Sequence, residues 1–168
     1  AVAKKASQCF NMKIVVHDPY VMEERVMDVG GVTANLTRTL RESDVVSINV
    51  PLTEETRNLF TRDQFKTMKN SAILVNTSRG KVIDQEALLW ALETGEIGKA
   101  ALDVLAEEPP KKDNPLFDLD NVIFTPHQAS NTGRGVRNMF MESIQNLIDA
   151  LEGKPHKYLI NKELLGQS

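Results

Sequence analysis

AILVNTSRG, residues 72–80, runs from four apolar residues through a polar triplet to an arginine and a glycine. The apolar run predicts a buried strand at residues 72–76, and the residues after it predict a tight turn. In an open parallel sheet, ligands bind beyond the carboxyl ends of the strands. Arg79 is therefore placed where it could hold an anion, although a solvated arginine on a surface turn would give the same pattern.

Predicted strands and helices alternate along the rest of the chain. We expect strands at residues 13–17, 32–34, 44–50, 72–76, 99–104 and 122–125, and helices at residues 1–12, 21–29, 36–43, 56–68, 84–94 and 131–152. The helix at 84–94 has the clearest ends, because Asp84 can cap its first turn and Gly95 can end its last. The strands lack the alternation of a sheet with one wet face, so the order predicts an α/β fold whose parallel sheet is covered on both faces.

The composition excludes some broad classes of protein. A length of 168 residues suits one domain, with or without an appendage. The net charge of −3 argues against nucleic acid or an anionic membrane surface as the main partner. No apolar run in the sequence reaches the roughly 20 residues of a membrane span. We therefore expect no nucleic-acid partner and no membrane association.

Cys9 is the only cysteine in the sequence. A single cysteine excludes an internal disulfide, which fits a reducing cytosol, and we expect a cytoplasmic protein. We expect Cys9 to be a small buried side chain on a helix face rather than a reactive thiol. The helix at 1–12 has no capping side chain ahead of Ala1 and the chain does not start with methionine, so we also expect a piece of a longer protein.

Ionisable residues follow four of the predicted strands. These residues are Asp18, Arg79, Asp103 and His127, and Glu108 lies in the loop after Asp103. A lone aspartate after a strand is usually a turn residue, and a lone histidine before a helix is usually a cap. The carboxyl ends of parallel strands meet at one edge of a sheet, however, so all four residues would converge there. This convergence predicts a functional site.

Three motifs in this region resemble the cofactor domain of the D-isomer-specific 2-hydroxyacid dehydrogenases. They are Asn76 to Gly80, Ala101 to Val104 followed by Glu108-Pro109, and Thr125 to His127. The segments His17-Asp18-Pro19 and 50–56 fit the same family. The resemblance covers nearly the whole chain, from Ala1 to about Asn161.

The resemblance implies a Rossmann-type fold, a doubly wound parallel α/β sheet that is incomplete in this sequence. The first strand and the Gly-x-Gly-x-x-Gly turn of that fold are missing, as is the family's separate substrate domain. Residues 1–152 would form a partial dinucleotide-binding domain, and residues 153–168 a tail returning to the substrate domain. In the strand order 3-2-1-4-5-6, the strands at 13–17 and 45–50 would flank the missing strand. We expect these two strands to close up, to bind a neighbouring chain between them, or the first to repack elsewhere.

The resemblance also implies three catalytic residues. Arg79 would hold the substrate carboxylate through its planar fork and polarise the neighbouring carbonyl. His127 would exchange a proton with the carbonyl oxygen, because histidine can carry a proton near neutral pH. Glu108 would orient His127 and favour its charged form.

NAD is the implied cofactor, and no metal is implied. Asp18 follows the strand whose terminal acid binds the ribose hydroxyls; it would repel a 2′-phosphate, which favours NAD over NADP. Asp103 would contact the nicotinamide carboxamide. The remaining residues implied to line the cofactor site are Val50, Pro51, Thr56, Thr77 and Ala129.

The function implied for the full-length protein is hydride transfer between NAD(H) and a small D-2-hydroxy acid or 2-keto acid, in a homodimer. Glyoxylate, hydroxypyruvate, phosphohydroxypyruvate and pyruvate all remain open as substrates. The isolated chain is expected to bind NAD poorly and to turn over nothing. An alternative is an NAD-sensing binding module, like the transcriptional corepressors of this family. Formate dehydrogenase is disfavoured, because it has glutamine at the position of Glu108.

Overall fold

The computed structural model describes residues 1–154. It divides into two compact units, residues 1–127 and a second unit that starts at Gln128. The division into a cofactor domain at 1–152 and a tail at 153–168 stays a prediction, since most of that tail lies outside the described residues. The boundary between the two compact units lies earlier in the chain, between His127 and Gln128.

The first unit alternates helices and strands as the sequence predicts, and all six expected strands form. In chain order its elements are α1 (Val2–Phe10), β1 (Ile14–Val16), α2 (Glu23–Met27), β2 (Gly31–Thr33), α3 (Leu36–Glu42), β3 (Val45–Ile48), α4 (Arg62–Thr67), β4 (Ile73–Asn76), the 3₁₀ helix η1 (Gly80–Val82), α5 (Gln85–Thr94), β5 (Lys99–Leu102), the 3₁₀ helix η2 (Pro115–Asp118) and β6 (Val122–Phe124). The predicted α/β class is confirmed.

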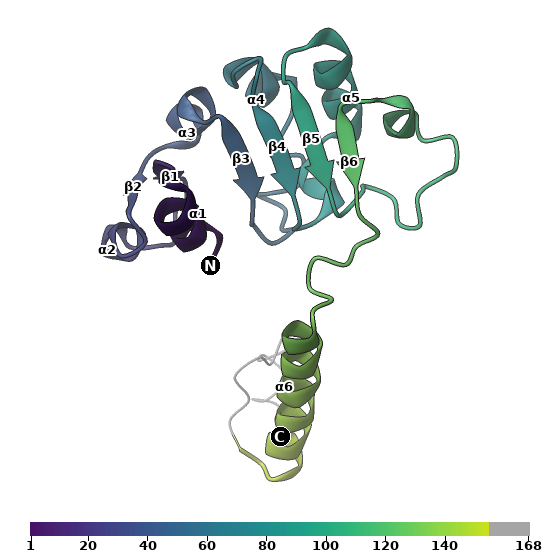
Figure 1. Cartoon of the computed structure of the whole chain (residues 1–168). Coiled ribbons are helices and arrows are strands. Elements are labelled where there is room, and N and C mark those ends of the chain that lie inside the picture. The colour runs from purple at the N-terminus through teal and green to yellow at the C-terminus, as the bar shows by residue number, and fades with distance from the viewer. Residues whose placement is uncertain (155–168) are drawn as a thin grey trace. The chain divides into compact units, whose positions relative to one another are not determined.

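The strands form two parallel sheets (Figure 1). β1 pairs with β2, while β3, β4, β5 and β6 pair in that order. Leu74 lies at the centre of the larger sheet, opposite Val46 on one side and Ala100 on the other. Of the three outcomes expected for these strands, closure of β1 onto β3 does not occur: among the described residues β1 pairs only with β2, and β3 only with β4.

Helices of the first unit cover one face of the four-stranded sheet. The crossovers through α4 and α5 run in one direction along the sheet, and right-handed crossovers then place both helices on the same face. Leu74, Phe65 and Leu88 pack there in the main core, each at most 2% exposed. On the opposite face Val45 is 40% and Ile123 69% exposed. Within the first unit, helices therefore cover one face of these strands.

Local hydrogen bonds fix where the helices begin. Asp84 caps α5 as predicted, since its Oδ1 accepts the N–H groups of Glu86 and Ala87 at 3.0 and 3.2 Å. α4 was expected to begin at residue 56 but begins at Arg62, because Gln64 Oε1 folds back to accept the N–H of Thr61 at 3.1 Å. Residues 54–58 form turns instead.

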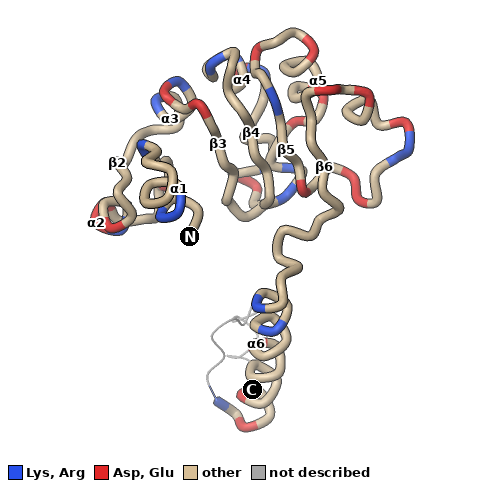
Figure 2. The backbone as a smooth tube through the Cα atoms, viewed as in Figure 1, with Lys and Arg blue, Asp and Glu red and all other residues tan. Residues whose placement is uncertain are grey.

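Helix α1 is amphipathic as expected, yet it buries none of its residues. Cys9 is exposed, so the prediction of a buried cysteine is wrong. The physical reason is that α1 packs beside the short strand β1, which offers too little surface to cover its apolar side. Lys and Arg are interspersed with Asp and Glu along the first unit (Figure 2).

The second unit contains α6 (Gly133–Leu151), close to the predicted helix at 131–152. Thr132 caps it by accepting the N–H of Gly135 at 3.0 Å. No side chain of α6 is fully buried. Among the described helices, none combines the length and the apolar character needed to cross a bilayer.

Candidate active site

The structure places the four predicted residues just beyond the carboxyl ends of strands. Arg79, Asp103 and His127 follow β4, β5 and β6, which are neighbours in one sheet. Asp18 follows β1, in the smaller sheet. Glu108 interacts with His127 and with the charge of Arg79, and the backbone of His127 is bonded to that of Asp103; these links define the candidate site.

Glu108 and His127 form a direct pair. The Oε2 atom of Glu108 lies 2.7 Å from Nδ1 of His127, and Oε1 accepts the N–H of Leu105 at 3.0 Å. Partial burial opposes ionisation of Glu108, but the bonds from His127 and Leu105, with the charges of His127 and Arg79, outweigh it and lower the pKa of Glu108 below its usual value. An ionised Glu108 requires a proton on Nδ1, which directs Nε2 of the ring to other partners.

The backbone of His127 is held in an uncommon conformation. Its φ angle is +49°, a region that residues with side chains adopt rarely. The N–H of His127 reaches the carbonyl oxygens of Asp103 at 2.9 Å and Thr125 at 3.0 Å. The hydroxyl of Thr125 donates to the carboxylate of Asp103, which is only 5% exposed. Such conformations cluster at functional sites, where surrounding contacts hold them in place.

Arg79 lies on a turn that is closed by Asn76. The Oδ1 atom of Asn76 accepts the N–H of Ser78 at 3.0 Å and its hydroxyl at 2.8 Å, while Nδ2 donates to the carbonyl of Arg79 at 3.0 Å. The guanidinium donates to the carbonyl of Ser78 at 2.7 Å through Nη1. Arg79 is exposed, and its five N–H donors leave capacity for an anion.

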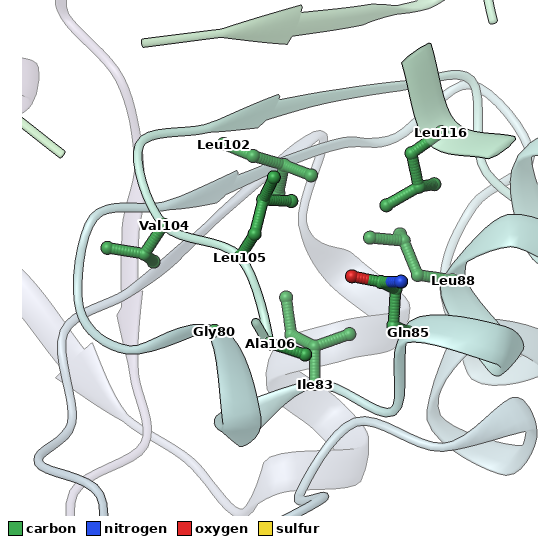
Figure 3. A pocket seen from close by; sticks show the side chains of 9 residues that line it. All are labelled: Gly80, Ile83, Gln85, Leu88, Leu102, Val104, Leu105, Ala106 and Leu116. Atoms are coloured by element: carbon green, nitrogen blue, oxygen red, sulfur yellow. The ribbon is translucent and has the colours of Figure 1, made fainter. Parts of the chain in front are cut away.

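Gly80 joins the Arg79 turn to the loop that carries Glu108. A Cβ atom at this position would lie 2.0 Å from both the carbonyl carbon and the oxygen of Leu105, and 2.5 Å from the nitrogen of Ala106. Figure 3 shows this region, where Gly80, Leu105 and Ala106 line one small cavity together with Leu88 of α5. Only glycine allows so close an approach of the two backbones.

Several of the expected cofactor residues follow strands of the larger sheet, while Asp18 follows β1 in the smaller sheet. Val50 and Pro51 follow β3, where the hydroxyl of Thr56 donates to the carbonyl of Pro51 at 2.6 Å. Thr77 follows β4 and is exposed. Asp18 accepts the N–H of Tyr20 at 2.9 Å through Oδ1, so its carboxylate has a fixed orientation.

This donor set fits NAD. A carboxylate suits the ribose hydroxyls, and exposed polar groups at adjoining strand ends suit the nicotinamide half. Ala129 belongs to the second unit.

The sequence interpretation missed two residues of this site. Asn76 and Thr125 appear there only as parts of motifs, yet Asn76 holds Arg79, which is expected to be catalytic, and Thr125 holds Asp103, which is expected to contact the cofactor. A signal was present, because each is a polar residue at or just after the end of a buried strand. Buried polar groups need hydrogen-bond partners, so such positions indicate a role in holding a turn.

Comparison with known proteins identifies the family. Residues 1–129 match the family model described as D-isomer specific 2-hydroxyacid dehydrogenase, NAD binding domain. The chain belongs to this family. It is 40% identical over 166 residues to a glyoxylate/hydroxypyruvate reductase B of Salmonella newport, an alignment that covers 99% of the chain and 51% of that protein. The matched domain is an NAD-binding domain, so NAD is its cofactor.

Solved dehydrogenase structures share the fold. The holo form of D-mandelate dehydrogenase from Rhodotorula graminis superposes with a TM-score of 0.86 at 32% identity, covering 96% of the chain and 47% of that structure. D-lactate dehydrogenase with NAD+ from Lactobacillus jensenii gives a TM-score of 0.79 at 33% identity, covering 95% and 52%. The chain spans between 30% and 51% of the curated relatives that it matches first. The Rossmann-type fold is confirmed by these neighbours.

Proposed function

We propose that the intact protein transfers a hydride between NAD(H) and a small D-2-hydroxy acid or 2-keto acid. The observation that carries the proposal is the 2.7 Å contact between Glu108 and His127 close to the charge of Arg79. This arrangement provides a proton carrier and a carboxylate receptor at one edge of the sheet. The triad of Arg79, Glu108 and His127 is assigned as catalytic.

Each residue has a separate task in the reaction. Arg79 binds the substrate carboxylate with its planar donor fork and holds the neighbouring carbonyl in place. His127, held by Glu108 through Nδ1, donates a proton from Nε2 to the carbonyl oxygen in reduction and takes it back in oxidation. NAD(H) supplies or accepts the hydride at the carbonyl carbon. One hydride and one proton convert the C=O group to an H–C–OH group, so the step balances.

The cofactor contacts are assigned to Asp18, Val50, Pro51, Thr56, Thr77, Asp103 and Ala129. Asp18 favours NAD over NADP, because its carboxylate would repel a 2′-phosphate. Small 2-keto acids such as glyoxylate and hydroxypyruvate are the proposed substrate class, supported by the name of the Salmonella relative.

A cytoplasmic homodimer is the proposed state of the intact enzyme. The single cysteine supports a reducing compartment. Exposed apolar side chains in the first unit support association between copies: Phe10 is 74% exposed and Met22 is 65% exposed. The isolated chain of 168 residues, about half the length of the reductase relative, is expected to turn over nothing.

The test is Arg79→Lys in the intact enzyme. Lysine keeps the charge but loses the fork, and charge-assisted hydrogen bonds are worth about 1.5–3 kcal/mol, so kcat/KM for the keto acid should fall about 10- to 100-fold. The dissociation constant for NADH should stay nearly unchanged. Arg38→Lys, which alters a surface pair with Glu42 on α3, is the matched control. An unaltered kcat/KM in Arg79→Lys would sink the assignment.

A panel of 2-keto acids separates the enzyme from the alternative function. Turnover of glyoxylate, hydroxypyruvate, phosphohydroxypyruvate or pyruvate by the wild-type protein supports the dehydrogenase. Tight NADH binding without turnover of any of them would instead indicate an NAD-sensing module.

A further inference from the structure

We propose that Asn76 is a positioning residue that aims Arg79 at the substrate carboxylate. The inference rests on the proposed function, because it assigns a task to the residue that supports Arg79. Asn76 does not touch the substrate in this assignment. It acts through the turn that carries Arg79.

The main chain of Asn76 is fixed from both sides. Asn76 is the last residue of β4, in register with Ile48 of β3 and Leu102 of β5. Its carbonyl accepts the N–H of Asp103 at 2.9 Å. The residue is 0% exposed. A side chain rooted at such a position has little freedom, so the groups bonded to it are fixed relative to the sheet.

The side-chain amide of Asn76 fixes the orientation of Arg79 through hydrogen bonds. Its Oδ1 holds Ser78 by two bonds, and its Nδ2 holds the carbonyl of Arg79 at 3.0 Å. Ser78 in turn accepts Nη1 of Arg79 at 2.7 Å through its carbonyl. The buried amide of Asn76 thus holds the backbone of Arg79 directly and its guanidinium through Ser78.

Only an amide satisfies this geometry at neutral pH. The turn needs an acceptor for Ser78 and a donor for the Arg79 carbonyl on one flat group, and asparagine carries both. Aspartate keeps the volume and the acceptor but, when ionised, has no donor. Its second oxygen would face the carbonyl of Arg79, and the turn would open. A protonated aspartate would restore the donor as an O–H group.

The central experiment compares Asn76→Asp with Asn121→Asp in the intact enzyme. Asn121 is a matched control, because its Nδ2 also donates to backbone carbonyls, at 3.2 Å to Gly98 and 3.4 Å to Leu92, but it precedes β6 at the opposite edge of the sheet. We expect Asn76→Asp to lower kcat/KM for the keto acid at least tenfold, mainly through KM, with NADH affinity within twofold. The loss should shrink as the pH is lowered and the introduced carboxyl takes up a proton. Values within twofold of the control, or an equal loss of NADH affinity, would overturn the proposal.

A double-mutant cycle with Arg79→Lys shows whether Asn76 acts through Arg79. If it does, the double variant should be no worse than Arg79→Lys alone, whereas an independent structural effect would multiply the two losses and overturn the proposal. If Arg79→Lys itself has no effect, the proposed function fails. If Arg79→Lys lowers kcat/KM and Asn76→Asp does not, only this inference fails.

A milder variant covers the case in which Asn76→Asp does not fold. Ser78→Ala removes one of the bonds to Oδ1 and leaves the buried amide in place. We expect a threefold to tenfold rise in KM for the keto acid with unchanged NADH affinity. An unchanged KM would overturn the proposal.

Discussion

Replacing Gly80 with alanine should move Arg79 out of alignment with Glu108, two residues of the proposed catalytic triad. The new Cβ would lie 2.0 Å from the carbonyl carbon and oxygen of Leu105, where ordinary contacts are 3.4–4 Å. Both partners are backbone, so no flexible side chain can move aside. The Gly80 turn and the Leu105 peptide must therefore separate by more than 1 Å.

This backbone displacement would move the catalytic residues directly. Arg79 is the neighbour of Gly80, and the N–H of Leu105 holds Oε1 of Glu108 at 3.0 Å. A shift of more than 1 Å breaks that bond or moves Glu108 with it. Misplacement of a reacting group by about 1 Å can cost roughly 100-fold in rate, so we expect kcat/KM to fall by about that factor. Overpacking of a tight contact also destabilises by about 1–3 kcal/mol.

Two measurements on Gly80→Ala check this reasoning. Steady-state kinetics of the intact enzyme should show the loss in kcat/KM, and urea denaturation of the 168-residue chain should show a lower free energy of unfolding. Gly133→Ala is the control, since a Cβ there meets nothing within 4 Å. A Gly80→Ala enzyme with wild-type kinetics would refute the argument that this contact aligns Arg79 with Glu108.

Three further predictions concern Glu108 and Asp84. Glu108→Gln should lower kcat/KM for keto-acid reduction, because the carboxylate that contacts Nδ1 of His127 at 2.7 Å and orients its ring is lost; Glu107→Gln, an exposed neighbour, is the control, and an unchanged kcat/KM would exclude the pairing. Because the pKa of Glu108 is lowered in the folded chain, its ionised carboxylate should stabilise the fold above the ordinary glutamate pKa, and this contribution should be lost as the pH falls through the lowered pKa. The free energy of unfolding in urea, measured at a series of pH values, follows this loss. Asp84→Ala should lower the free energy of unfolding of the chain by about 1 kcal/mol, since two N–H groups of α5 lose their cap; a loss no larger than that of Asp113→Ala on the exposed loop would contradict this.

The strands and their order along the chain could be predicted because buried parallel strands are short apolar runs with polar ends. Four such runs, beginning near Val45, Ile73, Ala100 and Val122, form the larger sheet as expected. The position of α4 could not be read from apolar spacing. Residues 56–61 carry a helical pattern, but Phe60 pairs with Ile83 as an isolated bridge and Thr61 begins the capping box. That pairing joins residues distant in sequence, so no local pattern shows it.

Burial was harder to predict than secondary structure. Cys9 lies on an amphipathic helix, which normally indicates a buried face, but exposure depends on what the helix packs against. The same holds for the open face of the larger sheet, where Val45 and Ile123 remain exposed. A sequence shows which residues can be buried; the extent of the neighbouring surfaces decides which of them are.

The residues that gather beyond the strand ends of the larger sheet were predictable, but the contacts that support them were not. Topology alone predicts that Arg79, Asp103 and His127 converge after their strands, whereas the catalytic roles of Arg79, Glu108 and His127 rest on the family resemblance and stay a prediction. The contact between Gly80 and Leu105 depends on the path of two loops, and the sequence gives only a glycine. Thr125 looks like an ordinary strand end until the structure places its hydroxyl on Asp103.

The hydrogen-bond ladder of the sheet explains how these loops achieve a fixed geometry. It continues past the strand ends: Asp103 donates to Asn76 at 2.9 Å, Thr125 to Leu102 at 3.0 Å, and His127 to Asp103 at 2.9 Å. The backbone that precedes Arg79 and the backbone of His127 are therefore joined through Asp103, by the same kind of bond that joins β4 to β5 and β5 to β6. An acid that carries the proton and an arginine that binds the anion must keep one spacing through each turnover. Extending the ladder by one residue on each strand fixes that spacing with main-chain atoms. Substitutions of exposed loop side chains other than Arg79, Glu108 and His127 should consequently be tolerated, while changes at Asn76, Gly80 or Asp103 should not.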